Sequence, residues 1–192
     1  MDSRVGVRTA LVVAIGLLLQ LSLFADTPVF GVTPDVVLLT AIGIGLAGGP
    51  ERGALAGFAG GLLLDCTVTT PFGLSALVGA STGYVVGGLQ HAVLGSTWWT
   101  PLAVAGIASS AGTLAYGILG ALLGNLDWLG PRTVLVALGV GVLNTLLAVV
   151  VLPITRWSQG EPLGLDRLRL PEALTRHRRG ASRRRRPQRG GW

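Results

Sequence analysis

The sequence contains no lysine, a single cysteine and few charged residues of any kind. The one cysteine, Cys66, excludes an internal disulfide bond and any metal site that needs several cysteines. Charged residues make up 12% of the chain, about half the ~25% found in soluble domains. Half of the 192 residues are hydrophobic, so intrinsic disorder is excluded for most of the chain. The composition argues against a soluble domain and favours a membrane protein.

Positive charge is concentrated at the C-terminal end. Residues 156–192 hold eleven of the 15 arginines and three acids, a net charge of +8, whereas residues 1–155 carry −2. The prolines and glycines of this segment predict a disordered tail. Its run Arg183, Arg184, Arg185 and Arg186 would attract anionic lipid, by about 1 kcal/mol per residue near the surface. Nucleic acid would use the same charges, but the tail has no interleaved aromatic residues, so none is predicted. Docking of a cytoplasmic protein stays open.

Apolar runs predict an all-α membrane protein with six transmembrane helices in residues 9–155. A transmembrane helix needs ~17–25 residues, and four of the runs reach this length. The second and third runs are shorter and share a turn containing Glu51 and Arg52. A re-entrant loop would place both charges inside the membrane at ~2.5–3.5 kcal/mol each, so two spans are favoured. The predicted spans are 9–25, 33–49, 53–70, 72–94, 101–124 and 133–155.

Arginines fall on alternate loops and set the predicted orientation. Arg4 and Arg8 precede the first span, Arg52 follows the second, and the tail follows the sixth. The positive-inside rule assigns these segments to the cytoplasm. Residues 1–8 and 156–192 are therefore both predicted to be cytoplasmic, in a multi-pass protein of the plasma membrane. The first span has no small-residue cleavage site and is interpreted as uncleaved.

Glycines recur at four-residue spacing within the apolar segments. The 30 glycines follow no Gly-X-Y repeat, which excludes a collagen-like chain. Small residues let helix backbones approach closely in lipid, where burial of apolar surface drives no association. We expect these glycines to pack the helices together, although the same spacing could also present a flat face to another membrane protein. The predicted packing positions are Gly45, Gly49, Gly53, Gly57, Gly61, Gly79, Gly83 and Gly87.

Two acids in the apolar body are candidate functional residues. Asp65 lies 12 residues after Gly53, or ~18 Å along a helix, which places it in the outer half of the membrane. An acid at that depth is a functional candidate, whereas a helix that ends at Asp65 would let the carboxylate face water or cap a loop. Both readings stay open. Asp35, after Pro34, is interpreted as an interfacial residue at the start of a helix, where an acid is favourable.

No catalytic residue, cofactor or metal site is predicted. Residues 79–83 match G-x-S-x-G, but this motif needs a strand–turn–helix elbow with an acid and a histidine. His91 lies ten residues beyond Ser81, ~15 Å along the same predicted helix, so the match is interpreted as chance. Asn144 and Gln20 are expected to form interhelical hydrogen bonds worth ~0.6–2 kcal/mol. Ser109, Ser110 and Thr113 add polarity that a ligand cavity could use.

A set of motifs resembles the MreD family of bacterial rod shape-determining membrane proteins. Pro34 opens the second span, Gly53 follows the turn, and Gly73 follows the element Gly57-Phe58-Ala59-Gly60-Gly61-Leu62-Leu63-Leu64-Asp65. The resemblance covers residues 9–155 in layout and is sharpest over 34–88. The long arginine tail departs from the short ending usual in the family.

This resemblance implies a non-catalytic component of the peptidoglycan elongation complex, the elongasome, that acts with MreC in the control of cell shape. Indirect partners would be the MreB filament, RodA and its transpeptidase. The family fold is similar to the substrate-binding subunits of energy-coupling-factor transporters. A vitamin-type substrate-binding subunit is therefore the alternative, and an intramembrane enzyme ranks third. On this basis Asp65 and Gly73 would shape a pocket or a partner surface near the outer face.

Overall fold

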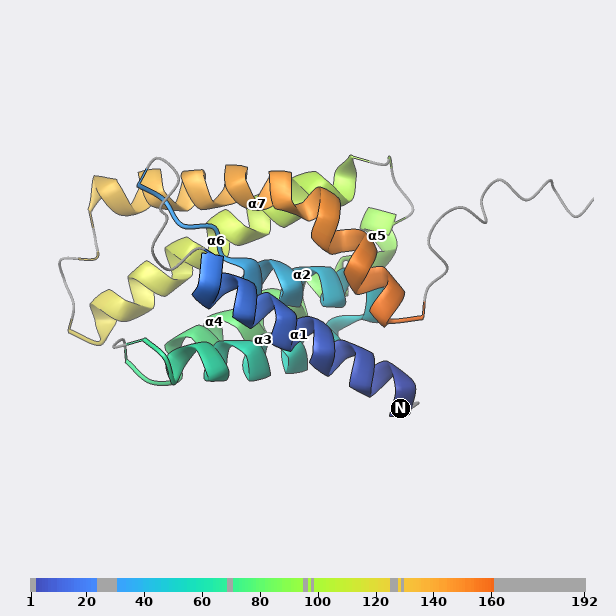
Figure 1. Ribbon diagram of the computed structural model, residues 1–192. Helices are drawn as coiled ribbons and strands as arrows, with labels where there is room; N and C mark the ends of the chain where they lie inside the picture. The colour runs from blue at the N-terminus through green and yellow to red at the C-terminus, as the bar shows by residue number, and fades with distance from the viewer. Residues whose placement is uncertain are drawn as a thin grey trace, which may run out of the picture. The chain divides into compact units, whose positions relative to one another are not determined.

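The structure is a computed structural model that describes residues 3–23, 31–68, 71–94, 97, 99–124, 128 and 130–160. These residues form helices joined by turns, without a strand (Figure 1). The tail from residue 161 onward, including the predicted lipid-binding run Arg183–Arg186, lies outside the described residues. The helices are α1 (Ser3–Leu23), α2 (Val36–Gly48), α3 (Pro50–Asp65), α4 (Leu74–Gly88), α5 (Gln90–Leu94), α6 (Thr100–Leu122) and α7 (Pro131–Ser158).

Three of the described helices, α1, α6 and α7, are long and apolar enough to cross a membrane. The apolar helices α2 and α4 are shorter, with 13 and 15 residues. At 1.5 Å per residue, α2 is only about 20 Å long. The all-helical class expected from the sequence is confirmed, together with three helices of membrane-spanning length.

The remaining helices differ in length from the expected spans. Helix α2 begins at Val36 rather than at 33 because Pro34 and Asp35 precede it, and Asp35 is its N-cap. Helix α3 ends at Asp65, five residues before the expected end at 70. The expected single helix 72–94 is divided at Leu89 into α4 and α5. Two consecutive glycines end α4, and glycine is a poor helix former.

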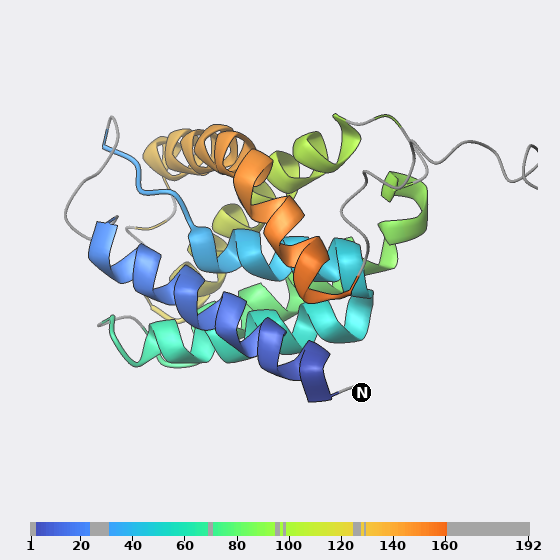
Figure 2. The ribbon, with the colours of Figure 1, turned by 45° about the vertical axis from the view of Figure 1, so that its right-hand side comes forward.

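Helix α2 lies at the centre of the bundle. Every residue from Val36 to Leu46 is buried, as expected for a helix that is apolar on all sides. Figures 1 and 2 show α1, the α3–α4 pair and α7 around it. Leu38, Leu39 and Ile42 form the main core with residues from α4, α5, α6 and α7. The short second apolar run is therefore the core helix of the fold.

Polar contacts bring the start of α1, the α2–α3 turn and the end of α7 to one end of the bundle. Gln159 donates a hydrogen bond from Nε2 to Thr9 Oγ1 at 2.8 Å, and its Oε1 accepts one from Arg52 at 3.0 Å. The Arg8 guanidinium lies 4.8 Å from the ring centroid of Trp157. We call this region the arginine end. Helix α7 reaches it by changing direction in its C-terminal part (Figure 2), where Pro153 interrupts the helical hydrogen bonding.

The α3–α4 crossing is packed backbone to backbone through glycine. Gly53 faces the carbonyl of Gly83, and Gly57 faces that of Gly79, at distances that leave no room for a side chain. A Cβ added to Gly45 on α2 would lie 2.6 Å from Gly83 O, and one on Gly87 would lie 2.5 Å from the Pro50 Cα. Gly61 similarly faces the backbone of Ser75. The predicted spacing therefore corresponds to close contacts within the chain.

Gly49 differs from the other predicted packing glycines. Its φ of +91° places it in the turn between α2 and α3, a conformation that L side chains rarely adopt. The nearest atom to a Cβ there would be Gln90 Oε1 at 3.5 Å, an ordinary contact. This glycine permits the sharp reversal of the chain rather than a helix crossing.

Candidate functional site

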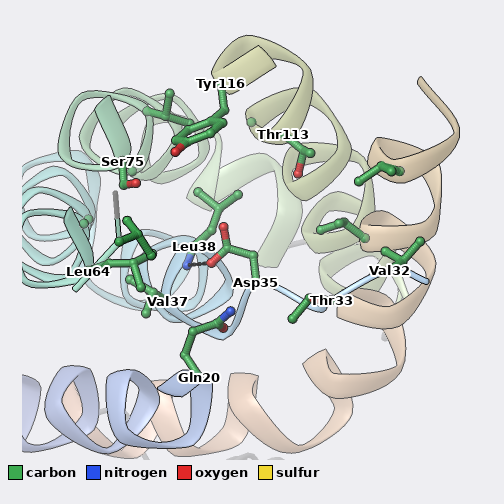
Figure 3. A pocket seen from close by; sticks show the side chains of 18 of the residues that line it. Gln20, Val32, Thr33, Asp35, Val37, Leu38, Leu64, Ser75, Thr113 and Tyr116 are labelled. Atoms are coloured by element: carbon green, nitrogen blue, oxygen red, sulfur yellow. Dashed lines mark hydrogen bonds between the residues drawn. The ribbon is translucent and has the colours of Figure 1, made fainter. Parts of the chain in front are cut away.

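A cavity of about 350 Å³ (Figure 3) is lined by residues at the end of α1, the start of α2, the end of α3 and the start of α4, at the end of the bundle away from the arginine end. Its walls come from α2, α3, α4, α6 and α7, from Gln20 near the end of α1, and from the segment that leads into α2. This volume lies at the lower end of the ~300–1,000 Å³ of small-molecule sites. Most of the lining side chains are valine, leucine or glycine, with a few polar groups among them.

Of the described residues on the cavity wall, Asp35 is the one that carries a formal charge. As the N-cap of α2, it accepts a hydrogen bond at Oδ1 from Leu38 N at 2.8 Å, which satisfies one of the free amide groups at the helix start. Its other carboxylate oxygen is directed toward the side of the cavity formed by Thr113 and Tyr116 (Figure 3). The interpretation of Asp35 as a helix-start residue agrees with its position, and the structure adds that it faces a cavity.

Two polar side chains from other helices hold the start of α2 in place. Asn144 on α7 accepts a hydrogen bond from Asp35 N at 3.1 Å and donates one to Asp35 O at 3.0 Å. Its amide also donates to Ser109 Oγ on α6 at 2.9 Å. Gln20 on α1 accepts from Val36 N at 2.8 Å. The interhelical hydrogen bonds expected of Asn144 and Gln20 are thus present, and they fix the backbone that carries the Asp35 carboxylate.

The remaining polar groups of the wall are hydroxyl groups and the Gln20 amide, and one of the hydroxyls can only accept. Thr113 donates its hydroxyl proton to Ser109 O at 2.9 Å, so its oxygen can only accept from a ligand. Tyr116 stacks on Trp128 with ring centroids 5.5 Å apart, and its side chain lies over the cavity (Figure 3). The Ser75 side chain faces the cavity from α4. Thr113 was among the polar residues that the sequence marked as available to a cavity.

Asp65 lies beside the cavity and binds the backbone of Ser75, which lines it. The side chain is buried, with an exposed fraction of 3%. Its Oδ2 accepts from Gly73 N at 2.9 Å and from Ala76 N at 3.2 Å, and Oδ1 accepts from Ser75 N at 3.2 Å. Asp65 is thus the cap of α4, and it ties the α3–α4 connection to a residue that lines the cavity. Of the two readings of Asp65, the structure matches a helix that ends there with a carboxylate that caps a loop.

Gly73 supplies the conformation that this cap requires. Its φ of +91° puts it in the left-handed region at the N-cap of α4, which favours glycine. No atom of the described residues lies within 4 Å of the position of a Cβ there, and the positive φ by itself explains the glycine. Asp65 and Gly73, which the resemblance groups together, are in direct contact.

Sequence reasoning did not single out Ser75 and Tyr116 as cavity residues. Ser75 could have been noticed because it stands ten residues after a buried acid, at the start of a helix. Tyr116 is the one tyrosine in α6 and sits three residues after Thr113, so it shares a face with that residue. Neither signal identifies a cavity without the packing of the other helices.

The other motifs lie away from this site. The Ser81 hydroxyl donates to Leu77 O at 2.6 Å, within its own helix, and His91 is exposed on α5. Among the described residues, no three His, Cys, Asp or Glu side chains are grouped to hold a metal ion. Cys66 is exposed in the α3–α4 connection.

Comparison with known proteins identifies no family for this chain: no family model, curated protein or solved structure matches it.

Proposed function

We propose that this protein is a MreD-type component of the bacterial elongasome, a non-catalytic membrane scaffold that acts with MreC. The observation that carries the proposal is the unit formed by the resembling residues. Gly57 and Gly61 lie in the close α3–α4 crossing, and Asp65 binds Gly73 at the end of that pair. The motif that resembles MreD is therefore one continuous structural element. MreB, RodA and its transpeptidase would be indirect partners through MreC.

The proposal includes six passes through the plasma membrane with both termini in the cytoplasm. It is supported by the arginine end, where Arg8 and Arg52 lie close to Trp157 and Gln159 at the end of α7. The positive-inside rule places this end in the cytoplasm, and the cavity then opens toward the outside. Helices α2 and α3 cross as a hairpin that is shorter than the ~30 Å hydrocarbon core. Because the other helices enclose α2, the bilayer would need to thin around α3 rather than around α2.

Copurification tests the scaffold proposal. The full chain, tagged at its N-terminus, is expressed at native level and isolated in mild detergent with the MreC-like protein of the same cell. An unrelated six-span protein with the same tag serves as the control. We expect the MreC-like protein to be enriched with the tagged chain only, and we expect depletion of the chain to round the cells. Failure to copurify, together with tight binding of a vitamin, would overturn the proposal.

A second candidate function is a small-molecule binding subunit of a transporter, similar to those of energy-coupling-factor systems. The cavity favours it, because it is walled mainly by apolar groups and contains a carboxylate and hydroxyl groups, the arrangement common in ligand sites. Denaturing extraction of the purified protein, followed by mass spectrometry of the extract, tests it. A small molecule present in stoichiometric amount would support the transporter subunit. An extract without such a molecule, from a protein that copurifies with the MreC-like protein, would support only the scaffold function.

A further inference from the structure

We infer that the cavity binds a compact ligand with a protonated amine at one end and an apolar body, with Asp35 as the counter-ion. The inference rests on the second candidate function, the use of this cavity as a ligand site, and adds the chemical class of the ligand. It is independent of whether the chain also binds MreC.

The first argument is charge. Among the described residues that line the cavity, Asp35 is the one with a formal charge, and none is an arginine or a histidine. Ionisable groups at membrane depth are normally paired, and the Asp35 side chain is half-buried on the cavity wall. The partial positive charge at the start of α2 offsets only about half a charge. A cationic ligand would supply the missing counter-charge, whereas an anionic ligand would be repelled.

The second argument is hydrogen-bond polarity. Asp35 presents a carboxylate oxygen to the cavity (Figure 3), and the Thr113 oxygen can only accept because its proton is bound to Ser109 O. A ligand head with N–H donors matches both groups. A quaternary ammonium lacks such donors, so a primary or secondary amine is the better match. The ring of Tyr116 adds an aromatic face, which attracts cations.

The third argument is the shape of the rest of the site. Away from Asp35 the wall is formed by side chains such as Val78, Val136 and Val140 and by glycines of the α3–α4 crossing. This apolar region would cover the body of the ligand. The amine belongs either to a free metabolite or to a phospholipid headgroup whose amine alone enters the cavity, and the experiment below separates these sources.

The test uses the full chain in uncharged maltoside micelles and three probes of similar size and different charge. These are phenethylammonium, 2-phenylethanol and 3-phenylpropanoate, and their binding is measured by titration calorimetry. We expect phenethylammonium to bind at least tenfold more tightly than the other two. Equal binding of all three would overturn the amine assignment while leaving the cavity as a ligand site. Absence of binding by all three would overturn this inference and leave the MreC proposal untouched.

Matched variants assign the effect to Asp35. Asp35→Asn removes the charge and keeps a good N-cap, so we expect normal folding by circular dichroism and at least a tenfold loss of phenethylammonium affinity. Glu51→Gln removes the same charge at the other end of the bundle and should bind like the unaltered protein. Thr113→Val, which removes one acceptor, should weaken binding as well. Unchanged affinity in Asp35→Asn would overturn the proposal, whatever the result for Thr113→Val.

Competition identifies the source of the amine. Phosphatidylethanolamine and phosphatidylglycerol are added separately to the micelles before titration. If phosphatidylethanolamine alone lowers the apparent affinity for phenethylammonium, the amine is a lipid headgroup. If neither lipid competes, it is a free amine. Competition by phosphatidylglycerol alone would show a preference for an anionic lipid and would overturn the assignment.

Discussion

Substitution of Gly53 by alanine should separate the three central helices of the bundle. A Cβ at Gly53 would lie 2.7 Å from the Gly45 Cα on α2 and even closer to Gly83 O on α4. Both obstacles are backbone atoms, so no side chain can rotate away. The helices must instead move apart by about 1 Å to restore ordinary carbon contacts of ~3.5–4.0 Å. This displacement would also loosen the neighbouring contacts of Gly57 and Gly61.

The expected magnitude follows from two opposing effects. Overpacking of a close-packed interior typically destabilises by ~1–3 kcal/mol, and rigid backbone on two sides puts Gly53 at the upper end of that range. Replacement of glycine by alanine within a helix contributes up to ~1 kcal/mol of stability. We therefore expect a net loss of about 2 kcal/mol in the free energy of unfolding. Since ~1.4 kcal/mol is tenfold in an equilibrium constant, the unfolding constant should rise about thirtyfold.

Gly88 provides the matched control for this substitution. It lies at the end of α4, and no atom lies within 4 Å of the position of its Cβ. Gly88→Ala should therefore leave stability unchanged or raise it by a few tenths of a kcal/mol. Both variants are unfolded with increasing mole fractions of SDS, and helicity is followed by circular dichroism. Equal stability of Gly53→Ala and Gly88→Ala would refute the close helix crossing described here.

Two further predictions rest on the polar contacts and a third on the proposed orientation. Asp65→Leu leaves three amide groups at the start of α4 without their acceptor. It should lower the free energy of unfolding by about 1–3 kcal/mol and speed up proteolysis of the α3–α4 connection, whereas Asp65→Asn should retain part of this stability. Unchanged stability of the leucine variant would contradict the capping role of Asp65. Asn144→Leu should lower the SDS mole fraction at the midpoint of unfolding, because it removes hydrogen bonds to α2 and α6 that are each worth ~0.6–2 kcal/mol in a membrane protein. An unchanged midpoint would contradict the role of Asn144 in holding the start of α2. In intact cells, exposed Cys66 should react with a membrane-impermeant maleimide, whereas a Cys66→Ser, Glu51→Cys protein should react only after permeabilisation. The reverse labelling pattern would show that the protein has the opposite orientation in the membrane.

The sequence predicted the helical class and the closest contacts because both depend on local composition. Apolar runs mark segments that leave water, and four-residue glycine spacing marks one face of a helix. Gly53, Gly57 and Gly61 accordingly face α4 in the structure. Helix ends were less predictable. The end of α3 depends on Asp65, whose carboxylate oxygens accept hydrogen bonds from amides eight to eleven residues later in the chain. A hydropathy profile does not reveal these hydrogen bonds.

The cavity could not be predicted from the sequence, because residues from several segments that are far apart in the chain form it. Gln20, Ser75 and Thr113 belong to three helices, and each could have been an ordinary packing residue. Asn144 and Gln20 bind the backbone at the start of α2, which carries Asp35 on the same wall. The polar residues that the sequence assigned to interhelical bonding therefore have a second consequence, since they position the α2 terminus that closes the site.

The two acids of the apolar body illustrate why residue type alone does not assign a role. Asp65 accepts hydrogen bonds from three backbone amides through both of its oxygens, so its charge is compensated within the fold. Asp35 accepts from Leu38 N at one oxygen, the Val37 amide also interacts with the carboxylate, and the other oxygen is directed toward the cavity (Figure 3). Asp65, which accepts more hydrogen bonds from backbone amides, therefore has the structural role. The acid with a remaining acceptor is the one that can recognise a ligand, and this contrast places the candidate chemistry at Asp35 rather than at Asp65.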